Sequence, residues 1–229
     1  MSDVGVSAIS LADFGAVLAA LGALSTAAFG LLDVSKAFWG GVSLVGLSHI
    51  RDSLQRFNPA LAAAVGPDEW WSTVRANWIN GVPKPQQKAV VASLLKLGLS
   101  EETAPALAVG ARVDAAALAA VAGRLERGEP LDDADLNLLG RMTAALDAVL
   151  DAAFERAEQA YRNVSRLLAG LIALLLSAGA WALWDGPNKP SFWVACAVGL
   201  LAVPVAPVAK DLTSALSTAM RALKAARAL

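Results

Sequence analysis

Apolar residues recur three or four positions apart along the chain from Asp132 to Trp184. This spacing places them on one face of an α-helix. The positions are Leu139, Met142, Leu146, Leu150, Ala153, Ala157, Tyr161, Val164 and Leu168. The stretch is charged at first, but residues 167–183 carry no charge, which is about the length that crosses a bilayer core. The pattern therefore predicts one helix over residues 132–184, which begins outside the membrane and ends by crossing it.

Three residues of this face, Leu139, Leu150 and Tyr161, are eleven positions apart, and Ile172 continues the series. An eleven-residue repeat corresponds to roughly 3.67 residues per turn and keeps a seam nearly straight along the helix. We therefore expect Leu139, Leu150 and Tyr161 to be possible contacts between subunits of an oligomer.

Two other stretches are uncharged over lengths close to that of a membrane span, residues 14–32 and 192–209. A short polar turn, residues 185–191, precedes the last of them. Interfacial tryptophans are expected on either side of a loop between two spans, and three flank this turn: Trp181, Trp184 and Trp193. The sequence therefore predicts an all-α membrane protein with three transmembrane helices.

Small residues form a stripe at helical spacing in the first span. The stripe consists of Gly15, Ala19, Gly22, Thr26 and Gly30. Small residues allow helix backbones to approach closely in lipid, where large apolar side chains give no drive to associate. The stripe predicts a helix–helix contact, either within the chain or between subunits.

Residues 34–50 show no polar face, so they are expected to be buried in protein or in lipid. The uncharged part, residues 37–50, is short for a span, and residues 33–36 contain no glycine or proline to form a hairpin. We expect one long first helix that leaves the membrane near Asp33 and packs against the helix of residues 132–184. The alternative is a second short span, which would give four in total.

Residues 51–131 are predicted to form a cytosolic module of short helices. One of them begins near Pro67 and carries an aromatic stripe of Trp70, Trp71 and Trp78. Tryptophan favours the headgroup region of a membrane, where its ring is buried and its N–H reaches water. These three residues are therefore predicted to anchor a helix on the inner membrane surface. The alternative is that they pack into a cytosolic helical core.

Two prolines, Pro204 and Pro207, interrupt the inner end of the last span, and the amphipathic tail of residues 210–229 begins with Lys210 and Asp211. A proline in a helix removes a backbone donor and frees the carbonyl four residues earlier. Free carbonyls at membrane depth have to face protein, water or an ion. These four residues are the expected inner mouth of any conduction pathway. Alternatively, Lys210 reaches the cytosolic headgroups and Asp211 caps the tail helix.

The composition narrows the classes of function. The chain has 229 residues, 56% of them hydrophobic, and its net charge of −1 provides no basic stripe for nucleic acid. The mean hydropathy is +0.53. Its single histidine, His49, excludes a multi-histidine metal site and makes a histidine-dependent catalytic site elsewhere impossible. The single cysteine, Cys196, is expected to be a buried apolar residue. We predict no enzyme activity, no cofactor and no metal.

The distribution of basic residues predicts the orientation. With three spans, Lys189 is the only one of the 19 Lys and Arg residues outside, in agreement with the excess of positive charge in cytoplasmic segments. Residues 1–13 are then outside and the tail is inside. The expected location is the inner membrane of a bacterium. The expected partners are the lipid bilayer, further copies of the chain and a cytosolic protein.

The sequence Ala206-Pro207-Val208-Ala209-Lys210-Asp211-Leu212, together with Phe154-Glu155-Arg156 and Tyr161-Arg162, resembles a group of uncharacterised bacterial membrane proteins. Those proteins end in a span followed by an Ala-Pro-x-x-x-Asp-Leu element, and the resemblance brings no activity with it. The predicted layout is also similar to that of the proton-channel subunits of the ExbB/TolQ/MotA group. However, residues 167–184 lack the Gly-Leu-Leu-Gly-Thr pattern and the threonines of that group's second span.

Two functions are consistent with these features. The favoured prediction is a homo-oligomeric pore, because three thin spans enclose a pathway only when several subunits assemble. The alternative is a non-conducting membrane scaffold whose cytosolic helices bind a partner protein.

Overall fold

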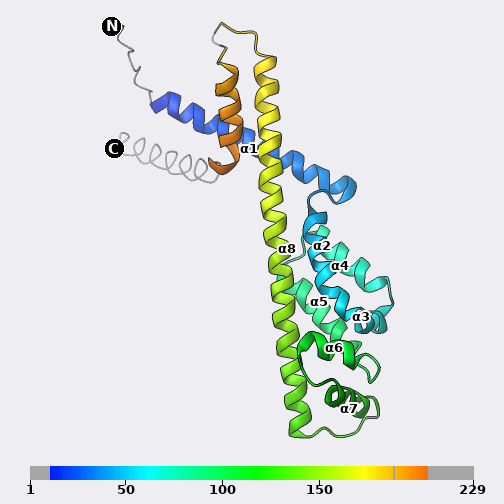
Figure 1. Cartoon of the computed structure of the whole chain (residues 1–229). Helices are drawn as coiled ribbons and strands as arrows, with labels where there is room; N and C mark the ends of the chain where they lie inside the picture. Colours follow the sequence, from blue (N-terminus) through cyan, green and yellow to red (C-terminus); the bar gives the residue numbers. More distant parts are fainter. Residues whose placement is uncertain (1–10, 188, 206–229) are drawn as a thin grey trace, which may run out of the picture. The chain divides into compact units, whose positions relative to one another are not determined.

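A computed structural model describes residues 11–187 and 189–205, and all of the regular secondary structure in these residues is helical. The labelled elements (Figure 1) are α1 (Leu11–Trp39), α2 (Ser43–Leu54), the short 3-10 helix η1 (Gln55–Phe57), α3 (Asn58–Val65), α4 (Glu69–Ile79), α5 (Lys84–Leu97), α6 (Ala104–Ala111), α7 (Ala115–Glu126) and α8 (Asp133–Ala182). A further helix covers Phe192–Val205. The predicted continuous helix of residues 132–184 is present as α8.

The chain divides into two compact units. The central unit comprises residues 39–163, and thus α2 to α7 with the first part of α8. The terminal unit comprises residues 1–38 and 164–229, and thus α1 up to residue 38, the last part of α8 and the helix Phe192–Val205.

The core of the central unit is built on one face of α8. The predicted apolar positions Met142, Leu146, Leu150, Ala153 and Ala157 are all buried, and so is the neighbouring Phe154. The short helices pack along this side of α8 (Figure 1). Their largest fully buried side chains are Ile50, Leu54, Phe57, Leu61, Leu95, Leu107 and Leu118. The face predicted from the periodicity is therefore the one on which the unit packs.

The ends of the short helices follow from local chemistry. Proline in the first turn starts α3, α5 and α6, where its missing N–H costs no helical hydrogen bond. The carboxylate of Asp114 accepts a hydrogen bond from the Ala117 N–H at 2.7 Å and so caps α7. These signals cut the chain into helices of 8–14 residues between α2 and α7.

Glycine permits two close approaches in this core. A Cβ atom on Gly46 of α2 would overlap the Trp78 ring and lie 2.9 Å from the Ala157 carbonyl oxygen. A Cβ atom on Gly98, at the end of α5, would overlap the backbone carbonyl of Ala60 in α3. Both positions therefore bring helices closer than any larger residue would allow.

The first helix ends earlier than predicted. α1 stops at Trp39, and Gly40 and Gly41 follow with φ angles of +80° and +48°. These angles belong to the left-handed region, which glycine adopts without steric cost. The next helix, α2, packs into the central unit. The prediction of one long helix to residue 50 is therefore wrong, and residues 34–50 do not form a single span either.

In the terminal unit, the end of α8 and the helix Phe192–Val205 lie side by side and antiparallel (Figure 1). The Ser177 hydroxyl of α8 donates a 2.6 Å hydrogen bond to the Ala195 carbonyl. A Cβ atom on Gly199 would lie 2.8 Å from the Leu174 Cα atom, so the two backbones are close. α1 lies across this pair in Figure 1, and its buried residues Leu21 and Ala28 share a small core with both helices.

Two helices are long and apolar enough to cross a membrane: α1, over Gly15–Lys36, and α8. Only 28% of the apolar window in α1 and 22% of that in α8 is buried inside the protein. The helix Phe192–Val205 is apolar but shorter within the described residues. The described part of the chain thus contains two candidate spans by length and composition, and a third apolar helix beside them.

The close approach at Gly98 gives a prediction for stability. Replacing Gly98 with alanine should destabilise the protein by about 1–3 kcal/mol, because the added methyl group forces α3 and α5 apart. Gly140 in α8 is the matched control, since an added Cβ atom there meets no described atom within 4 Å. Gly140→Ala should stabilise the helix by about 0.5–1 kcal/mol. Thermal unfolding followed by circular dichroism measures both, and equal midpoints for the two variants would contradict the packing described.

Candidate functional site

Of the three tryptophans predicted to lie on the membrane surface, Trp70 is in the core of the central unit, and Trp71 and Trp78 pack against that core. Trp70 is buried, and its Nε1–H donates to the Asn58 side chain at 3.1 Å. The Nε1–H of Trp78 donates to the Ser43 carbonyl at 2.9 Å. Trp71 is partly buried, with the Arg51 guanidinium 5.4 Å from its ring centroid. Trp70 is therefore part of the protein core and not an interfacial anchor, whereas that role for the partly exposed Trp71 and Trp78 stays a prediction.

The residues of the eleven-residue seam, Leu139, Leu150 and Tyr161, make contacts within the chain. Leu150 is only 1% exposed in the core of the central unit, and Leu139 packs against the same core. The Tyr161 ring makes an edge contact with Trp78, at 6.3 Å between centroids. A contact between subunits through Leu150 would require this core to open, so Leu150 is not an oligomer contact. Leu139 and Tyr161 are only partly buried, and their role as oligomer contacts stays a prediction.

The glycines of the small-residue stripe of α1 have no close neighbour among the described residues. A Cβ atom on Gly15, Gly22 or Gly30 would meet no described atom within 4 Å, and Ala19 and Thr26 are exposed. The Thr26 hydroxyl donates to the Gly22 carbonyl of its own helix at 2.8 Å. The buried residues of α1 lie roughly a third of a turn away around the helix, at Leu18, Leu21, Ser25, Ala28 and Leu32. Within the described residues, the stripe makes no helix–helix contact.

Trp181, beside the turn of residues 185–191, contacts both polar groups and an aromatic ring. The Trp181 Nε1–H donates to the Pro190 carbonyl at 2.8 Å, and the Lys189 ammonium lies 4.3 Å from the Trp181 ring centroid. Phe192 packs on the edge of the same ring at 5.1 Å between centroids. Trp184 and Trp193 are exposed. Their apolar rings and the polar turn lie together, as the sequence predicts for this end of the hairpin.

The inner end of the last span is described only in part. Pro204 lies within the helix Phe192–Val205 and is exposed. Pro207, Lys210 and Asp211 lie outside the described residues. The proposed inner mouth thus stays a prediction from the sequence.

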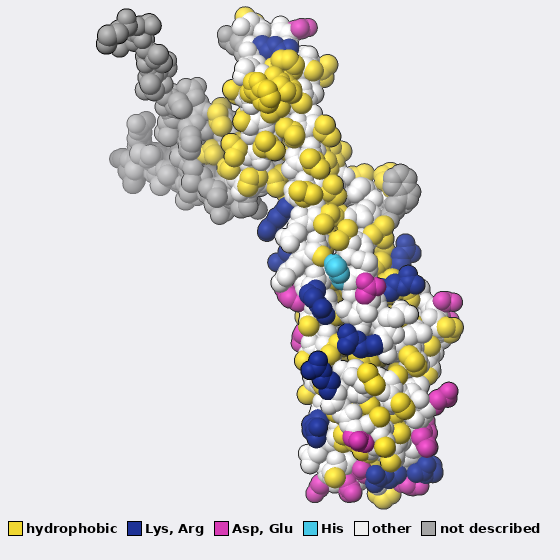
Figure 2. Space-filling model, viewed as in Figure 1, with side chains coloured by type: hydrophobic (Ala, Val, Ile, Leu, Met, Phe, Trp, Pro, Cys, Tyr) yellow, Lys and Arg dark blue, Asp and Glu magenta, His cyan; other side chains and the backbone are white. Residues whose placement is uncertain are grey.

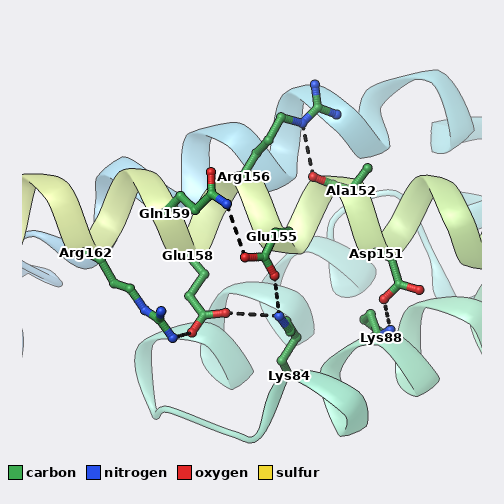
Figure 3. Close-up of polar contacts among 9 residues, drawn as sticks. All are labelled: Lys84, Lys88, Asp151, Ala152, Glu155, Arg156, Glu158, Gln159 and Arg162. Atoms are coloured by element: carbon green, nitrogen blue, oxygen red, sulfur yellow. Dashed lines mark hydrogen bonds and ion pairs between the residues drawn. The ribbon is translucent and has the colours of Figure 1, made fainter.

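A polar network that the sequence analysis missed connects α5 to α8 (Figure 3). The Lys84 ammonium, at the start of α5, lies 2.7 Å from a Glu155 carboxylate oxygen and 3.1 Å from one of Glu158. Arg162 pairs with the same Glu158, and one turn earlier on α8 Asp151 pairs with Lys88. The acidic residues 151, 155 and 158 share one side of α8, and this spacing is the signal that could have predicted the network.

The network shifts the pKa values of two of its members, Lys84 and Glu155, in the directions expected for ion pairs. The hydrogen bond to Glu155, with a further one to Glu158, raises the pKa of Lys84. The hydrogen bond from Lys84 and another from Gln159 lower the pKa of Glu155. Both groups are solvent-accessible, so their interaction is screened by water and contributes little to stability. The network thus joins α5 to α8.

Within residues 11–187 and 189–205, no group of three or more His, Cys, Asp or Glu side chains lies close enough to hold a metal ion. Cys196 is partly buried and unpaired in the helix Phe192–Val205.

No protein-family model, curated protein or solved structure matches the chain. The resemblance of residues 206–212 to uncharacterised bacterial membrane proteins, and the similarity of layout to the ExbB/TolQ/MotA group, therefore stay predictions.

The shifted pKa values predict a pH dependence. The pKa of Glu155 is lowered below 4.5, so its contribution to stability is present above pH 4.5 and is lost as the pH falls through the lowered value. The pKa of Lys84 is raised above 10.5, so its contribution is present below pH 10.5 and is lost on alkalinisation. Glu155→Gln should therefore lower the melting temperature slightly at pH 7, and the difference from the natural protein should disappear on acidification.

The matched control is Glu102→Gln, because Glu102 is exposed and makes no described ion pair. This variant should melt like the natural protein at both pH values. A difference for Glu155→Gln that persists unchanged at pH 3 would contradict the assignment of the effect to the ion pair.

Proposed function

We propose that the protein is a membrane-anchored helical scaffold. The terminal unit lies in the inner membrane of a bacterium, and the central unit binds a partner protein in the cytosol. The observation that carries this proposal is a change in burial along α8. Its first part buries large apolar residues in the central unit, whereas its last part exposes them: Leu167 is 66% exposed and Leu175 71%.

The burial pattern of the terminal unit supports the anchor. Its core consists mainly of small residues, such as Ala169, Ala173 and Ala202. Large apolar side chains cover the outside, at Val17, Leu31, Leu171, Leu200 and Leu201 among others. A water-soluble unit of this size would place its large side chains inside. Contact with lipid removes the cost of exposing them, and small residues between helices permit close packing there.

The described spans favour an anchor over a conduction pathway. Residues 14–32, 167–183 and 192–205 contain no ionisable side chain other than the Cys196 thiol. The hydroxyl groups of Ser25, Ser165 and Ser177 are buried inside the unit. A pore formed by several subunits would have to be lined by the outward faces, which are mostly apolar. Ion pathways are usually lined by carbonyl groups or charged side chains.

The central unit offers a surface for a partner. Val109 of α6 and Leu97 at the end of α5 are strongly exposed, although their neighbours Leu107 and Leu95 are buried. Single exposed apolar residues are common on protein surfaces, but these two are among the most exposed large apolar side chains in the unit. We infer that this part of the central unit contacts the partner.

A second function, a homo-oligomeric pore, is favoured by the small-residue stripe on α1. Because Gly15, Gly22 and Gly30 meet no described neighbour, a second copy of the helix could approach there closely. In the pore, a second copy of the chain contacts α1, whereas in the scaffold a different protein contacts the central unit. Crosslinking detects either contact.

The proposal predicts the topology of the hairpin. In a Cys196→Ala background, Asp185→Cys should react with a membrane-impermeant thiol reagent on intact spheroplasts, because residues 185–191 face outward. Leu97→Cys, in the exposed surface of the central unit, should react only after permeabilisation. Ser7→Cys should react without permeabilisation only if α1 is a third span. Equal labelling of the Asp185 and Leu97 variants in intact spheroplasts would contradict the anchor.

Photo-crosslinking in cells separates the two functions. A benzophenone amino acid at Val109 should form an adduct with one other protein, and the same group at the exposed Glu102 serves as the control. The group at Ala19 reports on the stripe, because a second copy there would give an adduct of twice the 23.5 kDa chain mass. A self-adduct at Ala19 without any heterologous adduct at Val109 would replace the scaffold with the oligomer.

A further inference from the structure

A polar cleft of about 250 Å³ opens on the central unit. It is lined by His49, Asp52, Ser53, Arg56 and Arg156. The first three belong to α2, Arg56 belongs to η1, and Arg156 comes from α8, about a hundred residues later in the chain. In Figure 2 the chain's single histidine, in cyan, is visible on the face shown, with both acidic and basic side chains near it. The packing of α2 and η1 against α8 therefore brings these groups together.

Each guanidinium group of the cleft is held by a backbone carbonyl three or four residues earlier in the chain. The Nε–H of Arg156 donates to the Ala152 carbonyl at 3.1 Å, and the Nε–H of Arg56 donates to the Ser53 carbonyl at 3.2 Å. The Arg56 guanidinium also lies 5.7 Å from the Phe57 ring centroid. Each arginine is thereby anchored through Nε, which leaves its two terminal nitrogens for another acceptor.

These arginines differ from several others of the central unit. Arg124, Arg127 and Arg162 each pair with a carboxylate. No described ion pair includes Arg56 or Arg156, even though Asp52 lines the same cleft. Figure 3 shows Arg156 on the other side of α8 from Lys84, and thus away from the acidic residues of that network. The cleft therefore contains two guanidinium groups without a carboxylate partner in the described part of the chain.

We propose that this cleft binds a phosphate group, either as free inorganic phosphate or as the phosphomonoester headgroup of a lipid. The planar guanidinium fork matches the oxygens of phosphate, and two of them can each donate two hydrogen bonds. The Ser53 hydroxyl and the His49 imidazole add further donors. The volume is below the range of roughly 300–1,000 Å³ that is usual for drug-sized ligands. It therefore suits a small anion better than a nucleotide.

Because the cleft is lined by charges of both signs, substitutions in it should change the phosphate affinity in opposite directions. Arg56 and Arg156 contribute two positive charges and Asp52 one negative charge, so the cleft has a net charge of +1 with His49 neutral. The Asp52 carboxylate repels a bound phosphate and lowers its affinity. Removal of the Asp52 charge should therefore strengthen binding, whereas removal of either arginine charge should weaken it. A general effect of surface charge predicts the same loss for arginines outside the cleft.

The test is isothermal titration of the purified full-length protein in a maltoside detergent and a phosphate-free buffer. The two probes are inorganic phosphate and dihexanoyl phosphatidic acid, with dihexanoyl phosphatidylcholine as the lipid control. Arg56→Gln and Arg156→Gln should each weaken binding at least tenfold, as expected for loss of charged hydrogen bonds. Asp52→Asn should tighten it several-fold. Arg75→Gln, an exposed arginine of α4 outside the cleft, should leave it unchanged.

The two probes distinguish the sources of phosphate. Tighter binding of the short-chain phosphatidic acid identifies a lipid headgroup, and equal or tighter binding of inorganic phosphate identifies the free anion. Unchanged circular dichroism spectra and melting temperatures establish that the variants are folded. The proposal is overturned if neither probe binds at millimolar concentration. It is also overturned if Arg75→Gln weakens binding as much as the two cleft variants.

Discussion

Burial of one face of α8 is the interaction on which the central unit depends. The helices between α2 and α7 have 8–14 residues, a length at which isolated helices are marginal in water. They form because their apolar faces cover Met142, Leu150 and Phe154 of α8, each of which is at most 2% exposed. Full burial of a side chain of this kind contributes about 1.5–3 kcal/mol. The packing also positions the polar groups. The ion-pair partners of Lys84 belong to α8, and Arg156 of α8 lines the arginine cleft.

The same helix follows a different rule after residue 163. In the terminal unit its buried positions are small, such as Ala169 and Ala173, and large side chains such as Leu167, Leu171 and Leu175 are exposed. The hydrogen bond from Ser177 to the Ala195 carbonyl and the close approach at Gly199 hold the last helix against it. A backbone in lipid has to satisfy its polar groups internally, and a helical hairpin with a short polar turn does so. The proposed anchor and the proposed cytosolic scaffold therefore share a single continuous helix.

Periodicity made the long helix predictable, because one apolar face persists over many turns. The end of α1 was also readable, since Gly40 and Gly41 are adjacent, but the prediction considered only residues 33–36, which contain no glycine or proline. The environment of the aromatic helix α4 could not be read from the sequence for a physical reason. A stripe of Trp70 and Trp78 is equally amphipathic whether a lipid surface or a protein core covers it. Only the hydrogen bonds to Asn58 and Ser43 identify the cover as protein.

The arginine cleft was not predictable from the sequence. Arg56 and Arg156 are a hundred positions apart, and nothing in their local patterns indicates that they meet. The fold alone brings them together. The Lys84 network was predictable in part. The spacing of residues 151, 155 and 158 indicates an acidic side of α8, but nothing in the sequence identifies Lys84 of α5 as its partner.

The central claim is that α8 passes from a water-exposed protein unit into lipid without interruption. Electron paramagnetic resonance of nitroxide labels on its exposed positions measures this most directly, in nanodiscs and in a Cys196→Ala background. Labels at Leu167, Leu171 and Leu175 should be more accessible to oxygen than to a water-soluble nickel complex, and labels at Leu136, Arg141 and Ala152 should show the reverse. High accessibility to the nickel complex at all six positions would contradict the account, because α8 would then lie in water along its whole length.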